Sequence, residues 1–228
     1  MNAMPFALLG FGFLSGMKHA FDADHVAAIS TIVAKHNLKK SSLLGIFWGF
    51  GHTITLLIAG LIVLLFKISI PEKVSLSLEF IVGVMLVSLG INVLITINKN
   101  KIHLHKHKHG KGEHIHFHSH KLSKNHEHLH QSFLIGLIHG LAGSAALTLL
   151  ILATIKSLFM GIIYILIFGI GSIAGMIIVS SIIASSFKLM PSKFEKAQKM
   201  LSISIGLISA IIGLAIIYDV GFVKGLLT

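Results

Sequence analysis

Residues 41–66 read SSLLGIFWGFGHTITLLIAGLIVLLF, which is a run of 26 residues without a lysine, an arginine or a carboxylate. About 20 apolar residues suffice to cross the roughly 30 Å hydrocarbon core of a bilayer. The run therefore predicts a transmembrane helix. His52 is its one titratable side chain.

Five more apolar stretches flank this one, and they begin and end near residues 5–33, 74–98, 131–155, 157–187 and 200–218. The first of them carries Lys18, His19, Asp22, Asp24 and His25 in its middle. No basic segment or small-residue cleavage site precedes it, so we interpret it as a span and not as a removed signal peptide. We expect an all-α integral membrane protein with six transmembrane helices.

The composition agrees with a membrane protein. Of 228 residues, 54% are hydrophobic and 12% are charged, and the mean hydropathy is +0.88, whereas soluble domains have about 25% charged residues. The net charge of +11 comes from lysines set between apolar runs, which leaves no basic face for nucleic acid. Cysteine is absent, which excludes disulfides, thiol nucleophiles and cysteine-based metal sites.

Lysines are distributed unequally between the loops on the two sides of the predicted membrane. Fourteen lie in the loops after the first, third and fifth stretches, and four lie on the other side. Because cytoplasmic loops are enriched in lysine, we expect a multi-pass protein of the cytoplasmic membrane with both termini outside and the loop after the third span in the cytoplasm.

The two halves of the chain form a weak repeat. Gly16 and His19 correspond to Gly136 and His139 at an offset of 120 residues. Further glycine pairs correspond at offsets of 120 and 123: Gly49 with Gly169, Gly51 with Gly171, Gly83 with Gly206, and Gly90 with Gly213. Three spans are an odd number, so the second unit enters from the opposite side, as in many transporters. We expect two inverted three-helix repeats, residues 1–98 and 131–228, joined by a loop, residues 99–130.

Two imidazoles and two carboxylates lie within seven residues of the first span, from His19 to His25, and the next span adds His52. Unpaired carboxylates are costly in a bilayer. On a regular helix His19 and His25 lie about 120° apart, so either they serve different partners or the helix breaks here. Imidazole with carboxylate suits Ni²⁺, Co²⁺ or Zn²⁺.

A purely structural interpretation competes with the metal site. In it Lys18 pairs with Asp22, Asp24 caps a helix and the histidines form hydrogen bonds in the core. For His52 alone the structural and functional interpretations are evenly balanced. For His139 we favour a structural role, because Ser144 and Ala145 stand where the first half has Asp24 and His25.

These motifs resemble the nickel/cobalt transporter family. His19 with Asp24 and His25 fits its H-x4-D-H signature, Gly51-His52-Thr53 resembles its second motif, and residues 139–146, HGLAGSAA, look like the start of the second half in its urease-accessory membrane proteins. The resemblance covers all six spans but not the loop. It implies metal-ion permeation, with His19, Asp24, His25 and His52 as metal-recognition residues. Asp22 is a further candidate ligand that could instead neutralise Lys18.

The loop between the halves is rich in histidine at alternate positions. Eleven of its residues from 103 to 130 are histidine: His103, His105, His107, His109, His114, His116, His118, His120, His126, His128 and His130. In an extended chain each group would share one face, whereas a helix would scatter it. Such clusters bind divalent metals with little selectivity, so we expect a secondary metal-binding arm or, alternatively, a solvated loop.

The sequence thus favours a secondary permease for nickel and/or cobalt ions, operating by uptake, with efflux or metal delivery to urease or hydrogenase maturation as alternatives. No nucleotide-binding loop of the form G-x-x-x-x-G-K-[ST] is present. We expect no enzyme activity and no cofactor. None of the predicted spans carries the H-E-x-x-H element that is usual in metallo-enzymes of this kind. The expected partners are the divalent ion as substrate and the lipid bilayer, without nucleic acid; a second copy of the chain or a metallochaperone stays open.

Overall fold

The computed structural model describes residues 4–34, 36–68, 70–99, 125–140, 155, 157–189 and 195–228, and these contain helices and turns but no strand. The helices are α1 (Met4–His19), α2 (Ala23–Val33), α3 (Leu38–Phe66), α4 (Glu72–Lys99), α5 (Asn125–His139), α7 (Leu158–Leu189) and α8 (Glu195–Tyr218), and a short π-helix, η2 (Asp219–Val223), continues α8. The all-α prediction is confirmed for the described residues.

Among the described residues, four helical segments are long and apolar enough to cross a membrane: Leu38–Phe66, Glu72–Ile97, Leu158–Leu189 and Lys196–Val223. They coincide with the second, third, fifth and sixth predicted spans, although α8 begins at Glu195, five residues earlier than expected. With this many apolar helices the chain is a membrane protein. The count of six spans stays a prediction, because residues 141–154 lie outside the described part.

The first predicted span is broken in its middle. Helix α1 ends at His19 and α2 begins at Ala23, and the turn between them is closed by hydrogen bonds from Phe21 N to Lys18 O at 2.9 Å and from Asp22 N to His19 O at 3.0 Å. The sequence left open whether the helix breaks here, and it does. Irregular backbone at membrane depth is tolerated where it is enclosed by protein.

The fourth predicted span differs from the expectation at its start. Helix α5 begins at Asn125, six residues before the predicted start, and a turn follows at Gly140. The backbone of the last histidine group of the predicted loop, residues 126–130, therefore belongs to a helix and not to an extended chain. Residues 100–124, which hold the other two histidine groups, lie outside the described residues.

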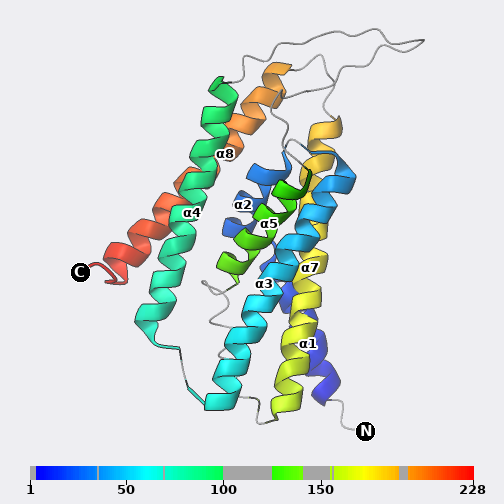
Figure 1. Ribbon diagram of the computed structural model, residues 1–228, viewed down its shortest axis with the longest axis vertical. Helices are drawn as coiled ribbons and strands as arrows, with labels where there is room; N and C mark the ends of the chain where they lie inside the picture. The colour runs from blue at the N-terminus through cyan, green and yellow to red at the C-terminus, as the bar shows by residue number, and fades with distance from the viewer. Residues whose placement is uncertain are drawn as a thin grey trace.

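Figure 1 shows how the helices are arranged. Helices α4 and α8 cross as one pair, helices α1, α3 and α7 form a second group, and α2 and α5 lie between them. Helices α3 and α7 run in opposite directions. The start of α3, the end of α4 and the start of α5 lie at one end of the molecule, here called the insert end because the histidine-rich loop joins the chain there. The end of α3 and the start of α7 lie at the other end, here called the opposite end.

Glycines allow the helices to approach closely, and the contacts come in matched pairs. A Cβ on Gly16 of α1 would collide with the backbone of Phe168 on α7, and one on Gly136 of α5 would collide with the backbone of Trp48 on α3. The second contact is the first one with the two halves exchanged, because Gly136 follows Gly16 by 120 residues and Trp48 precedes Phe168 by 120 residues. Two more sets of contacts are matched in this way. Gly51 lies against Phe133 as Gly171 lies against Phe13, and Gly83 lies against Gly213 as Gly90 lies against Gly206.

We predict that Gly16→Ala destabilises the protein whereas Gly10→Ala on the same helix does not. The added methyl at residue 16 meets the Phe168 carbonyl, whereas at residue 10 it meets nothing within 4 Å. Overpacking costs about 1–3 kcal/mol, and Gly→Ala in an open helix position gains up to about 1 kcal/mol. Thermal unfolding of the purified variants in detergent measures both. A midpoint for Gly16→Ala at or above that of Gly10→Ala would contradict this packing.

Candidate metal centre

Three buried histidines from three consecutive helices meet beside the broken span. His19 is the last residue of α1, His25 lies in the first turn of α2, and His52 lies near the middle of α3. Their ring centroids are 4.3 Å apart for His19 and His25, 5.0 Å for His19 and His52, and 5.3 Å for His25 and His52. One ligand atom of each lies within 4.8 Å of the others, so together they could hold one metal ion.

The turn between α1 and α2 makes this convergence possible. On one regular helix the His19 and His25 side chains would point about 120° apart. The turn at residues 20–22 lets α2 start in a new direction, so both imidazoles face the same space. On α3, Gly49 and Gly51 lie three residues and one residue before His52, and they bring that helix against its neighbours.

Two aspartates hold two of these imidazoles, those of His19 and His25, through their Nδ1 atoms. Asp22 Oδ2 lies 2.8 Å from His19 Nδ1, and Asp24 Oδ1 lies 3.2 Å from His25 Nδ1. An ionised carboxylate only accepts hydrogen bonds, so in each pair the imidazole N–H donates. Such carboxylate–histidine pairs fix the tautomer of metal-ligating histidines and turn Nε2 toward the ion.

Asp22 and Asp24 therefore do not act as the structural interpretation assumed. Asp22, and not Asp24, occupies the N-cap position of α2, and it makes no side-chain capping bond because its carboxylate engages His19. Its side chain is 39% exposed, whereas the side chain of Asp24 is 26% exposed. Asp22 therefore lies at the edge of the cluster and Asp24 lies deeper within it.

His139 joins the cluster, although the sequence favoured a structural role for it. It is the last residue of α5 and is fully buried. Its Nε2 lies 3.1 Å from Asp24 Oδ2, and its ring centroid lies 4.4 Å from that of His25. Asp24, His25 and His139 form a second group whose ligand atoms are all within 4.8 Å of one another. The offset of 120 residues between His19 and His139 was the signal that could have placed it here.

Hydrogen bonds between α3 and α5 hold His139 in place. Ser132 Oγ donates to Leu44 O at 2.7 Å, and Thr55 Oγ1 donates to Leu137 O at 3.0 Å. Gly140, which follows His139, lies against the backbone of His52. The end of α5 is thereby held against the middle of α3.

Several ring nitrogens of the cluster have no hydrogen-bond partner among the described residues: His25 Nε2, His52 Nδ1, His52 Nε2 and His139 Nδ1. A buried polar atom without a partner costs about 1–3 kcal/mol. Unpartnered imidazole nitrogens that face one another are what a borderline divalent cation such as Ni²⁺, Co²⁺ or Zn²⁺ coordinates. The donor set fits such an ion.

Apolar side chains close the cluster on two sides. Towards the insert end lies a buried group that includes Ile29, Val33, Leu44 and Trp48, and towards the opposite end lies one that includes Leu56, Val63, Tyr164 and Phe168. The Trp48 ring lies 5.5 Å from that of His139, and the Phe168 ring lies 5.8 Å from that of His19. The imidazoles are thus enclosed at both ends.

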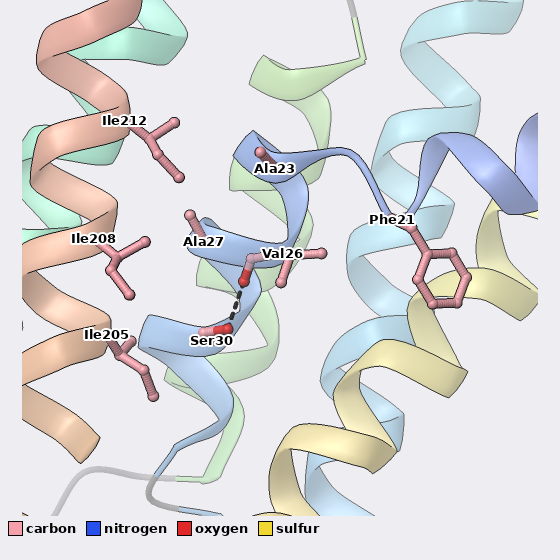
Figure 2. A pocket seen from close by; sticks show the side chains of 8 residues that line it. All are labelled: Phe21, Ala23, Val26, Ala27, Ser30, Ile205, Ile208 and Ile212. Carbon is pink, nitrogen blue, oxygen red and sulfur yellow. Dashed lines mark hydrogen bonds between the residues drawn. The ribbon is translucent and has the colours of Figure 1, made fainter.

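A separate cavity of about 350 Å³ lies between α2 and α8. Figure 2 shows that Ala23, Val26, Ala27 and Ser30 line it from α2, facing isoleucines of α8. At 100° per residue these positions lie on the face of α2 turned away from His25. Ser30 Oγ donates to Val26 O, which leaves the cavity apolar and without ligands for a metal.

Of the histidine-rich arm, only the last group is within the described residues. His130 is exposed at the start of α5. The predicted metal-binding histidines from His103 to His120 lie outside the described part of the chain, so their role stays a prediction.

Comparison with known proteins identifies the family. A family model described as "Cytochrome C biogenesis protein transmembrane region" matches residues 7–215. The chain belongs to this family.

Two curated relatives match this member of the family. The "Urease accessory protein UreH" of Bacillus sp. (strain TB-90) is 40% identical over 241 residues, covering 96% of this chain and 94% of UreH. The "Chloroplast protein FOR GROWTH AND FERTILITY 1" of Arabidopsis thaliana is 25% identical over 209 residues, covering 90% of this chain and 57% of that protein. No solved structure matches the chain.

The UreH match confirms the predicted resemblance to urease-accessory membrane proteins. The matching family model is not named for nickel or cobalt transport, so the wider resemblance to that superfamily stays a prediction. Neither relative is named as an enzyme, in agreement with the expectation from the sequence.

We predict that His52→Leu raises the stability of this cytochrome c biogenesis family member in the absence of metal. The substitution removes two unpartnered buried nitrogens, each costing about 1–3 kcal/mol, and leucine has a similar volume. The variant should also lose the rise in unfolding temperature that Ni²⁺ or Co²⁺ causes by binding the native state.

Thermal unfolding with and without metal measures both effects. His130→Leu, at an exposed position, is the control and should keep the metal-induced rise. A His52→Leu protein that metal stabilises as much as wild type would remove His52 from the site.

Proposed function

We propose that this chain transports divalent transition-metal ions, nickel and/or cobalt, across the cytoplasmic membrane as a secondary permease, in the direction of uptake. One observation carries the proposal: the buried imidazoles of His19, His25 and His52 converge within 4.8 Å at a broken helix. In membrane proteins, ionisable side chains at this depth mark ion pathways, and transporters bind substrates at discontinuous helices near the midplane.

The donor set supports a borderline divalent ion. His19, His25 and His52 supply neutral nitrogen, and Asp24 and Asp22 supply carboxylates that orient two of the rings. No thiolate is available, because the chain lacks cysteine. Imidazole with carboxylate favours Ni²⁺, Co²⁺ and Zn²⁺ over soft copper(I).

We propose six spans in two inverted three-helix repeats, residues 1–98 and 131–228, joined by the histidine-rich loop 99–130. The matched glycine contacts support this architecture, because a contact from the first half to the second recurs from the second half to the first at the repeat offset. Gly16 against Phe168 and Gly136 against Trp48 are such a pair. Inverted repeats are typical of secondary transporters.

The energy source would be the membrane potential or a proton gradient. The chain has no nucleotide-binding loop of the P-loop type. An inward-negative potential favours entry of a divalent ion by about 4.6 kcal/mol per 100 mV, from 2.3 per elementary charge. The sign of this term supports uptake.

Delivery of metal to a urease maturation complex is a second candidate function, and efflux is a third. The relative named as a urease accessory protein favours the second. In that function the chain would hand on a bound ion without moving it across the bilayer. A measurement of metal flux separates delivery, in which the ion does not cross the bilayer, from transport.

We predict that the full chain in sealed vesicles moves ⁶³Ni²⁺ or Co²⁺. His25→Ala and Asp24→Ala should lower the initial rate at limiting metal at least about tenfold, since losing even a residue that orients a metal ligand typically costs about 10–100-fold. His130→Ala should transport normally. Both site variants should elute from size exclusion as wild type does. Vesicles that bind metal at the intramembrane site without flux would favour metal delivery instead.

We also predict the topology from single cysteines placed in this cysteine-free chain. Lys39 and Lys73 are exposed in the first turns of α3 and α4, at the insert end and the opposite end (Figure 1). Because lysine-rich loops are cytoplasmic, an impermeant reagent should label Lys73→Cys in intact cells and Lys39→Cys after permeabilisation. The reverse pattern would invert the proposed orientation.

A further inference from the structure

His25 lies between two imidazoles that occupy equivalent places in the two halves. His19 and His139 are separated by the repeat offset of 120 residues. Their ring centroids lie 4.3 Å and 4.4 Å from that of His25. His19 ends α1 and His139 ends α5, so each half contributes the last residue of a short helix, and the two rings flank one imidazole.

Each flanking histidine belongs to its own group of three ligands. The first station consists of His19, His25 and His52, and the second station consists of Asp24, His25 and His139. The first is built from imidazoles alone, whereas the second includes a carboxylate. The two stations share one residue, His25.

The two ring nitrogens of His25 differ in their surroundings. Nδ1 lies 3.2 Å from Asp24 Oδ1, in the second station, whereas Nε2 has no hydrogen-bond partner. A neutral imidazole has one nitrogen lone pair and one N–H. His25 can therefore coordinate an ion through one nitrogen at a time, and the two stations cannot both use it.

Two aromatic side chains cover the stations from opposite ends. Phe168 lies 5.8 Å from His19 of the first station, and Trp48 lies 5.5 Å from His139 of the second. Both are buried, and they too are separated by 120 residues. Phe168 is in the half of α7 nearer the opposite end, and Trp48 is in the half of α3 nearer the insert end (Figure 1).

We infer that these groups are two successive binding stations for one divalent transition-metal ion, and that His25 hands the ion from one to the other. The inference rests on the proposed transport function. In the first station His25 binds the ion through Nε2 while its Nδ1–H donates to Asp24. In the second it binds through Nδ1: one water molecule takes up the Nδ1 proton and another gives a proton to Nε2, so the transfer has no net proton change. Phe168 covers the first station and Trp48 the second.

The test compares binding with flux in variants of the full chain. Equilibrium binding of Ni²⁺ to purified protein is measured against His25→Ala, which lacks both stations but carries the same histidine-rich arm, and flux is measured in sealed vesicles. His19→Gln removes a ligand of the first station, and His139→Gln removes one of the second. Lys73→Gln, at an exposed position outside the histidine-rich arm, is the control. Glutamine keeps an N–H near the position of Nε2, so His139→Gln preserves a donor to Asp24.

His19→Gln should lose at least about tenfold in both affinity and flux, as loss of a metal-site residue typically does. His139→Gln should keep its affinity within about threefold and lose at least about tenfold in flux. Lys73→Gln should keep both affinity and flux. His139→Asn, whose smaller side chain fits the same space, gives a second measurement of the same comparison.

The possible failures are distinguishable. Wild-type vesicles without metal flux would overturn the proposed transport function. Normal flux by wild type and by both His139 variants would overturn the second station and leave transport standing. Loss of affinity in the His139 variants equal to that in His19→Gln would mean one four-histidine site, and would overturn the transfer.

Discussion

The Asp24 carboxylate is the group on which the centre of this molecule depends. An ionised carboxylate at membrane depth is costly unless it is paired, and here imidazoles of α2 and α5 approach its two oxygens at 3.2 and 3.1 Å. Because His139 lies in the second half of the chain and Asp24 in the first, this side chain links the halves at the metal centre, beside the Ser132–Leu44 and Thr55–Leu137 hydrogen bonds. Replacing either partner would leave this partly buried carboxylate with half its hydrogen bonds, and breaking one side of a buried pair typically costs more than the intact pair contributes.

This pairing requires both the break between α1 and α2 and the close approach of the helices. A continuous helix would direct Asp24 and His25 away from His19, and a bulkier residue at 136 would hold α5 off α3. In a bilayer, apolar surface provides little drive for association, so small residues that bring backbones together and interhelical hydrogen bonds supply it. The same glycines that pack the helices thereby set the distances between ligands.

The sequence predicted most of the long helices and the grouping of His19, His25 and His52, and it offered the break as one of two alternatives, because charge-free length, charge placement and motif spacing are local properties. It did not predict the place of His139. In the second half, Ser144 and Ala145 stand where the first half has Asp24 and His25. This difference favoured a structural role for His139, although the repeat offset relates His139 to His19. The role of Asp24 was also beyond the sequence: whether a carboxylate binds an ion or orients imidazoles depends on distances across two helices. The α5 start was predicted late because histidines with a spacing of two imitate an extended chain.

The packing around α2 differs on its two faces, and this bears on how an enclosed cluster can exchange ions. Towards α3 and α5, His25 sits among rings 4.3 to 5.3 Å away. Towards α8, the same helix borders a cavity of about 350 Å³ lined by small and branched apolar side chains (Figure 2). This space is open to the surface, since Phe21, Ala23 and Ile208 of its lining are exposed, whereas α3 against α7 and α4 against α8 pack closely through their glycines. The element with unfilled space beside it is therefore the one that carries Asp24 and His25, so a shift of α2 alters the ligand distances without separating the glycine-packed helix pairs.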